Sequence, residues 1–500
     1  MRKLSVVLVI AGFTFFTSAR SQECTIGAAA GRATADGRPL LWKTRDYLSE
    51  PDNKVQFITN LGYRYLAVTD DGNVTTPWMG VNEYGFAIIN SNSTDLSDGS
   101  LTGPGNGTLM RMALTTCKTV TEFQALLDQT NITGRTTNAN FGVIDTTGAA
   151  AIFETAHYAY WRYNANDELN GYVLRTNFAF NGGGSGGIER YYRTVQLIGD
   201  LYSGDSLSHK SILRYQMRDF SDAGSQPVPI PYNGYWDGKP FGYIDNTLSI
   251  CRNSSVSASV IQGTLPGERA AYTTMWTLLG QPATSIFIPY WPVAATPDES
   301  TGSATAELGD IANQIRTLLY DLPSYSSYLD TYKLLNGSGK GLWTKTFPFE
   351  DNILTVVDAA LDNWRQMPAI PVSDIKYTED TIAYKTYQYL LGCYEYLLSG
   401  MTPVESPESI AGDPLLRAEI YPNSFETEAV LRYEVPMQST VTIEIFTLTG
   451  TRIGGVVYSD MAPGEYTYTI GGSGLRINSG LLIVKLNING RSRHFKLIRR

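Results

Sequence analysis

The sequence predicts an α+β fold in which two stacked antiparallel sheets are covered by helices, followed by a helical segment and a separate all-β unit. β-prone runs closed by Gly, Asn or Asp turns occur both before and after helical runs between residues 24 and 290. Residues 303–400 show the apolar spacing of helices, and residues 417–500 alternate apolar with polar side chains as strands do. Antiparallel hairpins with helices before and after them indicate sheets that stack on each other.

The first domain opens with strand-like runs that end in turn residues. They lie at residues 39–46, 55–59, 63–69 and 86–90. Helical spacing follows at residues 109–117 and 121–127, with Thr119 or Thr121 as the expected N-cap. Four more strands are predicted at residues 140–145, 149–155, 158–163 and 171–177, and a Thr146-Thr147-Gly148 turn joins the first two into a hairpin.

The second half of the chain returns to helices and then changes composition. Helices are predicted at residues 188–201 and 206–220, and strand-like runs at residues 254–263, 271–278 and 285–289. Longer helices at residues 306–319, 353–367 and 374–398 make residues 301–400 a helical extension of the domain at residues 24–300. Residues 401–416 have the Pro, Ser and Glu content of a linker, and residues 417–500 form the all-β domain.

The composition is that of a globular protein with sizeable cores. The 500 residues are 43% hydrophobic and carry a formal net charge of −9, which disfavours nucleic acid as a partner. Four cysteines are too few for a disulfide framework, and Cys117, Cys251 and Cys393 lie among apolar residues as buried thiols would. No pair has zinc-ligand spacing and no nucleotide-binding loop occurs, so neither a metal nor a cofactor is expected.

The N-terminus has the features of a cleavable export signal. Arg2 and Lys3 precede a mostly apolar stretch at residues 4–16, and the small residues at 17–21 suit a signal peptidase. This stretch is too short for a permanent membrane span. We therefore expect a signal peptide at residues 1–21, a short pro-segment at residues 22–23, and a protein that is secreted or held at the cell surface.

Cys24 is the residue best suited to covalent chemistry. If it became the first residue of the mature chain, its thiol could attack a carbonyl and its own α-amine could accept the thiol proton. No histidine would be required, and the chain has only three. Asp46, at the end of a predicted strand, is an acid that an adjacent strand could bring beside Cys24. The alternative reading is a buried or disulfide-bonded cysteine.

Four motifs occur in order from Cys24 onward. They are CTIG at 24–27, GVNEYGFAI at 80–88 (continuing to Asn92), VIDTTG at 143–148 and YVLRTN at 172–177. Together they resemble the N-terminal-nucleophile amidases of the choloylglycine hydrolase, penicillin V acylase and acyl-CoA:6-aminopenicillanate acyltransferase clan, over roughly residues 24–290. A later run, SSVSASVIQG at 254–263, is more similar to the acyltransferase branch. The resemblance implies a four-layer αββα Ntn-hydrolase sandwich and cleavage of a linear amide.

The resemblance also implies roles for single residues. Cys24 would be the nucleophile, its amine the general base, and Asp46 the acid that positions the amine. Asn92 would donate its side-chain amide to the oxyanion, and Asn177 would orient the amine or the substrate. Arg190, in the IERYYR run at 188–193, would help to keep the thiol ionised. The alternatives are a turn residue for Asp46, strand-end caps for both asparagines, and a solvated helix face for Arg190.

Three further residues, Lys43, Arg45 and Asn82, are candidates for binding substrate. In the bile-salt and penicillin branch of the clan, an arginine lies three residues before the aspartate. Here Lys43 stands at that place and Arg45 is adjacent. Because lysine lacks the planar fork of arginine, the sequence leaves open which of the two fills the role.

The all-β tail carries motifs of its own. They are IYPN at 420–423, IFTLTG at 445–450, SGLLIVKL at 479–486 and KLIRR at 496–500. Their order and terminal position resemble the C-terminal sorting domain of the type IX secretion system of Bacteroidetes. The resemblance implies an immunoglobulin-like sandwich with the type IX machinery as its partner. The alternative is a β-sandwich binding module.

The sequence thus predicts an exported, autoprocessed cysteine amidohydrolase or acyltransferase that acts on a small-molecule amide. Two alternatives stay open: a dipeptidase of the related N-terminal-cysteine clan, which the ATADG run at 33–37 also suits, and an inactive surface-binding scaffold. Strands rich in tyrosine and tryptophan favour an apolar acyl group. A positively charged site favours thiolate, so activity is expected to persist somewhat below neutral pH. The leaving amine and the oligomeric state are not predicted.

Overall fold

A computed structural model describes residues 23–47, 51–96, 102–221, 227–401, 418–422, 424–435, 438–447, 452–471, 480–489 and 491–499. The predicted signal peptide, Gln22 and linker residues 402–416 lie outside these ranges, as does part of each motif of the tail. The chain divides into two compact units, Met1–Ser406 and Pro407–Arg500.

The first sheet of unit 1 carries Cys24 on β1, which has a paired strand on each side. Its strand order is β10-β1-β2-β12-β13-β14, and all its pairs are antiparallel. The strands are β1 Cys24–Ala29, β2 Leu40–Asp46, β10 Tyr172–Arg175, β12 Ser255–Gln262, β13 Thr274–Leu279 and β14 Ile288–Tyr290. Every residue of β1, β2, β12 and β13 is buried, as expected for a sheet covered on both faces.

The second sheet is an antiparallel meander in which each strand pairs with the next along the chain. Its strands are β3 Asn53–Ile58, β4 Tyr65–Asp70, β5 Met79–Asn82, β6 Ala87–Asn92, β7 Ala139–Ile144, β8 Ala150–Thr155 and β9 Tyr160–Asn164. The predicted turn between β7 and β8 is present: Asp145 Oδ1 accepts from Thr147 N at 2.8 Å, and Gly148 has φ 85°.

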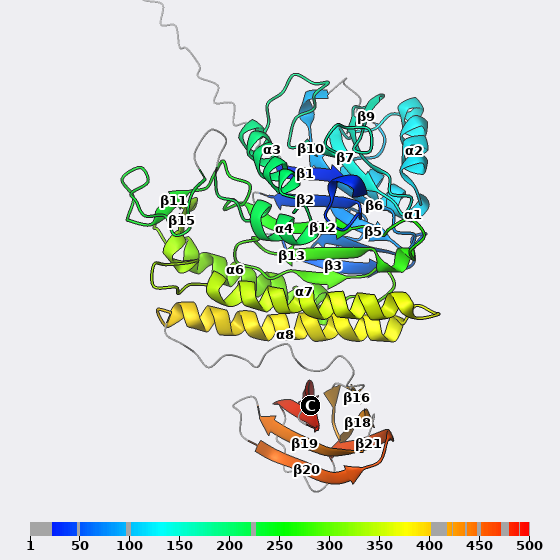
Figure 1. Ribbon diagram of the computed structural model, residues 1–500, viewed down its shortest axis with the longest axis vertical. Coiled ribbons are helices and arrows are strands. Elements are labelled where there is room, and N and C mark those ends of the chain that lie inside the picture. The colour runs from blue at the N-terminus through cyan, green and yellow to red at the C-terminus, as the bar shows by residue number, and fades with distance from the viewer. Residues whose placement is uncertain are drawn as a thin grey trace, which may run out of the picture. The chain divides into compact units, whose positions relative to one another are not determined.

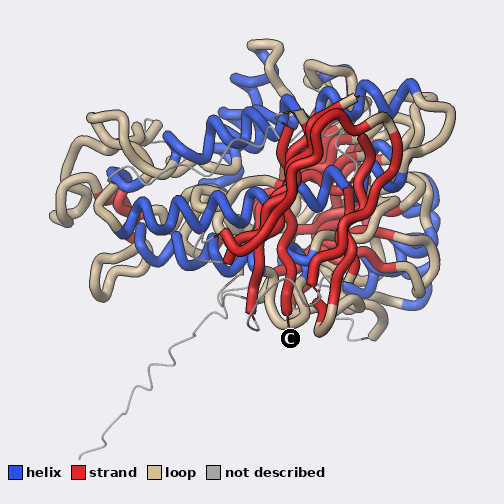
Figure 2. Tube along the Cα trace, turned by 90° about the horizontal axis from the view of Figure 1, so that it is seen from below, coloured by secondary structure: helices blue, strands red, loops and turns tan. Residues whose placement is uncertain are grey.

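Helices cover the outer face of each sheet. Helices α1 (Asn106–Thr116) and α2 (Val120–Thr133) share an apolar core with the meander, in which the Phe123 ring meets those of Phe141 and Phe153. Helix α3 (Ile188–Ser203) lies against β1 and β10. The two sheets contact each other through β1 and β2 on one side and β6 and β7 on the other. The predicted αββα arrangement of layers is therefore confirmed, and the strands of unit 1 lie between helices in Figure 1. Figure 2 distinguishes helices from strands by colour.

The helical extension belongs to the same unit. It comprises α5 Asp298–Thr301, α6 Glu307–Leu319, α7 Trp343–Gln366 and α8 Val372–Leu398. Helices α7 and α8 run side by side (Figure 1), and the rings of Phe349 and Tyr389 stack between them at 4.1 Å. Helix α8 contacts β14, and the buried carboxylate of Glu350 on α7 accepts from Arg218 Nη1 at 2.9 Å.

Some elements differ from those predicted. The predicted helix at residues 206–220 is a short helix α4 (His209–Ser211) followed by one wide turn, η3 (Ile212–Gln216), after which Arg218 joins the buried pair with Glu350. The strand predicted from residue 271 begins at Thr274. Strands β1 and β5, and the pair β11 (Tyr243–Asp245) and β15 (Tyr328–Asp330), were not predicted. They are short, and distant partners decide their pairing.

Unit 2 is a sandwich of two sheets. One holds β16 Ala418–Tyr421, β18 Glu428–Val435 and β21 Gly464–Gly471; the other holds β17 Ser424–Phe425, β19 Ser439–Thr447, β20 Arg452–Met461, β22 Gly480–Ile488 and β23 Arg491–Arg499. Both sheets contribute to one core, with Leu431 and Tyr433 from the first and Ile443 and Val484 from the second. Alternation of buried and exposed residues along β18 confirms the predicted pattern.

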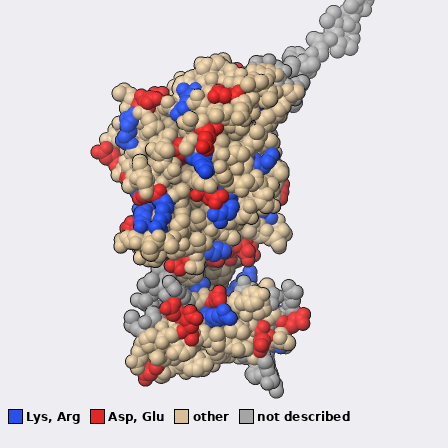
Figure 3. All heavy atoms as spheres, turned by 90° about the vertical axis from the view of Figure 1, so that its right-hand side faces the viewer, with Lys and Arg blue, Asp and Glu red and all other residues tan. Residues whose placement is uncertain are grey.

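The surface carries mixed charge. On the face of unit 1 shown in Figure 3, basic and acidic side chains are interspersed, with no large patch of either sign. Among the helices of the described residues, none is long and apolar enough to cross a membrane.

Candidate active site

The site is built around the start of β1. Cys24 is the first residue of this strand and is 2% exposed. It lies directly opposite Arg45 of β2, so the two side chains share a face of the sheet. Arg45 reaches Asp70 on β4 and Asn53 on β3, which shows that this face looks toward the second sheet. The Cys24 thiol therefore lies on the inner side of the sandwich.

Asn177 holds the nitrogen of Cys24. Its Oδ1 accepts from Cys24 N at 2.8 Å, while its Nδ2 donates to the backbone oxygen of Asn92 at 2.9 Å. Asn177 follows β10, the strand next to β1, and its own N–H bonds to Gly186 O at 3.0 Å. These contacts orient the amide, so that its oxygen faces the nitrogen that would become the catalytic amine.

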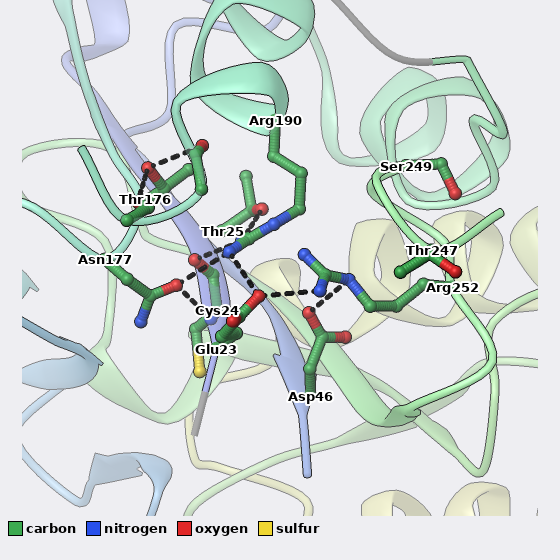
Figure 4. Close-up of polar contacts among 12 residues, drawn as sticks. Glu23, Cys24, Thr25, Asp46, Thr176, Asn177, Arg190, Thr247, Ser249 and Arg252 are labelled. Carbon is green, nitrogen blue, oxygen red and sulfur yellow. Dashed lines mark hydrogen bonds and ion pairs between the residues drawn. The ribbon is translucent and has the colours of Figure 1, made fainter. Parts of the chain in front are cut away.

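Arg190 completes the support of Cys24 from α3. It is 1% exposed and so does not lie on a solvated helix face. Its Nη1 donates to Cys24 O at 2.7 Å and to Thr25 Oγ1 at 3.0 Å, and its Nη2 donates to Asn177 Oδ1 at 2.8 Å. In Figure 4 the sulfur of Cys24 points away from this guanidinium. Arg190 thus contacts the backbone of the nucleophile, and the charges of the two residues also interact, since Cys24 acts to raise the pKa of Arg190.

A glycine allows this close approach. Gly187 precedes α3 with φ 68°, a left-handed conformation that glycine adopts without strain. A Cβ at this position would lie 2.2 Å from Arg190 Nη2. The arginine could not fold back onto Asn177 and Cys24 if any other residue stood here.

Asp46 was expected to position the nitrogen of Cys24, but its observed contacts are with other groups. Its carboxylate accepts from Ser255 Oγ at 2.6 Å and pairs with Arg252 Nε at 3.2 Å, but makes no bond to Cys24 N. Instead, the backbone N–H of Asp46 donates to the carbonyl oxygen of Glu23 at 2.8 Å. Burial raises the pKa of Asp46, and the charges of Arg252 and Arg190 oppose that rise.

Arg252 and Ser255 are site residues that were not predicted. Arg252 pairs with both Asp46 and Glu23, and it lies just before β12. The ladder between β12 and β2 shifts register between Ser255 and Ser257, which leaves Ser255 opposite Asp46. The SSVSASVIQG run at 254–263 contains Ser255, but nothing local in the sequence marks Arg252, because a bulge in a distant strand brings both residues to the site.

Lys43 and Arg45 have different surroundings. Lys43 is 1% exposed, and its Nζ donates to Asn90 Oδ1 at 2.8 Å and to Trp78 O at 3.0 Å. Burial lowers the pKa of Lys43 to about 8, while the charge on Cys24 acts in the opposite direction. Arg45 is fully buried in an ion pair with Asp70, at 2.7 Å from each carboxylate oxygen. The charge of Cys24 thus acts on Lys43, while the guanidinium of Arg45 is paired with Asp70.

The structure places Asn82 in contacts within the fold. Its side chain is fully buried. Its Nδ2 donates to the backbone oxygens of Leu114 and Cys117, at the end of α1, and its Oδ1 accepts from the N–H groups of Tyr84 and Phe86. All its hydrogen-bonding capacity is used to hold the turn between β5 and β6 against α1. Arg45, tied to Asp70, is likewise not free to bind substrate.

A cavity of about 450 Å³ adjoins the site and is lined by Asn92 and Trp78, whose backbone oxygens accept from Asn177 and Lys43. Eight of its eleven lining residues are Thr or Asn, and Trp78 is the one aromatic residue among them. The described wall therefore combines hydrogen-bonding groups with a similar amount of apolar surface.

The remaining titratable groups do not form a second centre. Within the described ranges, no cluster of His, Cys, Asp or Glu side chains could hold a metal ion. All four cysteines are free and buried, which confirms the prediction for Cys117, Cys251 and Cys393. Burial raises the pKa of each of these three thiols, to about 11 for Cys117 and about 12 for Cys393.

Residues 32–194, about a third of the chain, match the sequence model of the family described as acyl-coenzyme A:6-aminopenicillanic acid acyl-transferase. Two variants of conjugated bile acid hydrolase from Clostridium perfringens are 13% identical, cover 54% of this chain and 92% of their own, and give TM-scores of 0.35 and 0.34. Penicillin V acylase from Agrobacterium tumefaciens is 13% identical, with 54% and 86% covered and a TM-score of 0.33. No curated protein matches the chain. Over residues 32–194, the chain is thus similar to the acyl-coenzyme A:6-aminopenicillanic acid acyl-transferase family.

Proposed function

We propose that this protein is an N-terminal-cysteine amidohydrolase or acyltransferase that cleaves a linear, non-peptide amide through an acyl-thioester on Cys24. One observation carries the proposal: the nitrogen of Cys24 is held by Asn177 at 2.8 Å, at the start of an inner strand of an αββα sandwich. The match of residues 32–194 to an acyltransferase family supports the same class of chemistry.

Each residue of the site has its own role in the proposed reaction. Once Cys24 carries a free amine, that amine takes the thiol proton and the thiolate attacks the substrate carbonyl. The amine returns the proton to the leaving nitrogen, and water or an acceptor amine then resolves the thioester. Asn177 and Arg190 keep the cysteine in place, and Lys43 supplies positive charge near the thiolate. Asn92 lines the cavity, where its amide could donate to the oxyanion.

The cavity favours a polar substrate. Its Thr and Asn side chains offer several donors and acceptors, and burying these against an aliphatic acyl chain would leave them without partners. We therefore propose a substrate with hydrogen-bonding groups on its acyl or amine part.

We further propose that the protein is exported, that it processes itself, and that its C-terminal domain addresses it to the type IX secretion machinery. The export signal and the tail motifs support this proposal. The sandwich architecture of unit 2 agrees with a sorting domain and also with a binding module. Deleting residues 407–500 should leave turnover unchanged and abolish secretion from a type IX-competent host; secretion of the truncated chain would contradict the sorting role.

The function is tested with a thiol probe and a substrate panel. An alkylating probe should label Cys24 in preference to Cys117, Cys251 and Cys393, whose raised pKa values keep them protonated. The panel contains N-acyl amides, bile conjugates, penicillin V and dipeptides. Turnover of dipeptides alone would favour the dipeptidase alternative, and failure of both labelling and turnover would favour an inactive scaffold.

The pH profile tests Lys43. With its pKa lowered to about 8, Lys43 is a cation below that pH and neutral above it. If this charge supports the thiolate, kcat/KM should fall as pH rises through about 8. Lys43→Arg keeps its charge to much higher pH, so this fall should move upward even if the overall rate drops. If kcat/KM fell at the same alkaline pH in the wild type and in Lys43→Arg, a group other than Lys43 would be responsible for the fall.

A further inference from the structure

Glu23, the residue before the nucleophile, is anchored on both its backbone and its side chain. Its carboxylate Oε2 lies 2.6 Å from Arg252 Nη1 and 3.2 Å from Arg190 Nη2. Its carbonyl oxygen accepts from Asp46 N at 2.8 Å. These contacts converge in Figure 4, where Glu23 lies between the two arginines and Cys24. A residue that is discarded on maturation has no evident reason to be held so closely.

The two arginines make this a strong anchor. Arg190 is 1% exposed and Arg252 is 8% exposed, so their charges are largely removed from water. Burial and the charge of Arg252 lower the pKa of Arg190 to about 10, whereas the charges of Asp46 and Glu23 act in the opposite direction. A carboxylate between two buried cations forms charge-assisted hydrogen bonds with both. The negative charge of Glu23 therefore reduces the electrostatic repulsion between the guanidinium groups of Arg190 and Arg252.

We propose that Glu23 is the positioning residue for self-cleavage: its ion pairs with Arg190 and Arg252 hold the Glu23–Cys24 bond in place for attack by the Cys24 thiol. The proposal rests on the proposed function, because it assigns a role in the maturation of that same site. Both sides of the bond are fixed, the carbonyl oxygen by Asp46 N and the nitrogen by Asn177 Oδ1, each at 2.8 Å. The anchored side chain limits the remaining freedom of the acyl part.

The reaction balances without any outside reagent other than water. The Cys24 sulfur attacks the Glu23 carbonyl carbon, and the developing oxyanion receives the hydrogen bond from Asp46 N. The C–N bond breaks as the C–S bond forms, and the thiol proton passes to the nitrogen, which becomes the free amine. Water then hydrolyses the thioester, which restores the thiol and releases a peptide that ends in Glu23.

Cleavage and turnover can be measured separately, because Glu23 is absent from the mature chain. The precursor from residue 22 to residue 500 is made by cell-free synthesis behind a short N-terminal tag, and loss of the tag is followed over time. Glu23→Gln should slow cleavage by about 10- to 100-fold. The mature protein that finally forms should have the wild-type kcat and KM. Glu189→Gln, which removes a carboxylate beside Arg190 in sequence but outside the described ion pairs, should cleave at the wild-type rate.

Two outcomes separate this inference from the proposed function. Cleavage of Glu23→Gln at the wild-type rate would overturn the anchoring role and leave the amidase proposal standing. A second variant is made in which the initiator methionine directly precedes Cys24. Removal of this methionine exposes the amine of Cys24 without self-cleavage. Turnover by this chain is expected. Its failure to turn over any amide in the panel, with the fold intact, would count against the proposed function itself.

Discussion

Cys24→Ala is expected to abolish amide turnover and to leave the precursor uncut, while the fold is retained. Alanine removes the one atom that can form the acyl-thioester, so activity should fall by at least about 100-fold. The substitution removes a single sulfur atom from a strand that β2 and β10 still pair on both sides. N-terminal sequencing should find Cys24 first in the active wild type, and Gln22 and Glu23 retained in the variant.

The matched control is Cys117→Ala, which removes a buried thiol in the core between α1 and the second sheet. It should lower thermal stability somewhat and keep both turnover and cleavage. Residual turnover by Cys24→Ala above about one per cent of wild type would reject the nucleophile assignment. Trimming of the purified alanine variant to residue 24 would show that another protease removes the pro-segment.

Glu154→Ala is expected to cause the largest loss of stability. Glu154 on β8 is fully buried and accepts from Arg175 Nε on β10 at 2.6 Å, so the pair joins the two sheets. The same carboxylate accepts from the backbone N–H groups of Phe180 and Asn181, in the segment that follows Asn177. Removing it leaves a buried arginine without its counter-charge, which costs about 3–5 kcal/mol. Chemical denaturation should show the loss, and kcat/KM should fall as the Asn177 segment loosens.

The exposed ion pair between Glu83 and Arg64 provides the control for Glu154→Ala. Glu83 lies 2.6 Å from Arg64, whose side chain is 49% exposed. Glu83→Ala should change the free energy of unfolding by no more than about 1 kcal/mol, because water screens such a pair. Equal effects of the two substitutions would show that the Glu154–Arg175 pair does not join the sheets in the way its burial suggests.

Much of the architecture follows from local patterns. The meander strands other than β5, the start of α2 with its Thr119 cap, and helices α6 and α8 were predicted close to their observed bounds, because turn residues and apolar periodicity are local properties. The wide turn after α4 was missed, since the segment leads into a buried pair between Arg218 and Glu350, far apart in sequence.

The sequence by itself predicted the class of chemistry, because Cys24 follows an export-signal pattern and the ordered motifs are local features of the chain. Only the tertiary structure decided how the site is supported. Asn82 and Arg45 resemble site residues in sequence. In the structure, the side chain of Asn82 bonds to the end of α1 and that of Arg45 pairs with Asp70. Arg252 comes to the site because a bulged strand places it beside Asp46 and Glu23. Such contacts depend on which buried polar groups find partners when the sheets stack, and no local pattern encodes that outcome.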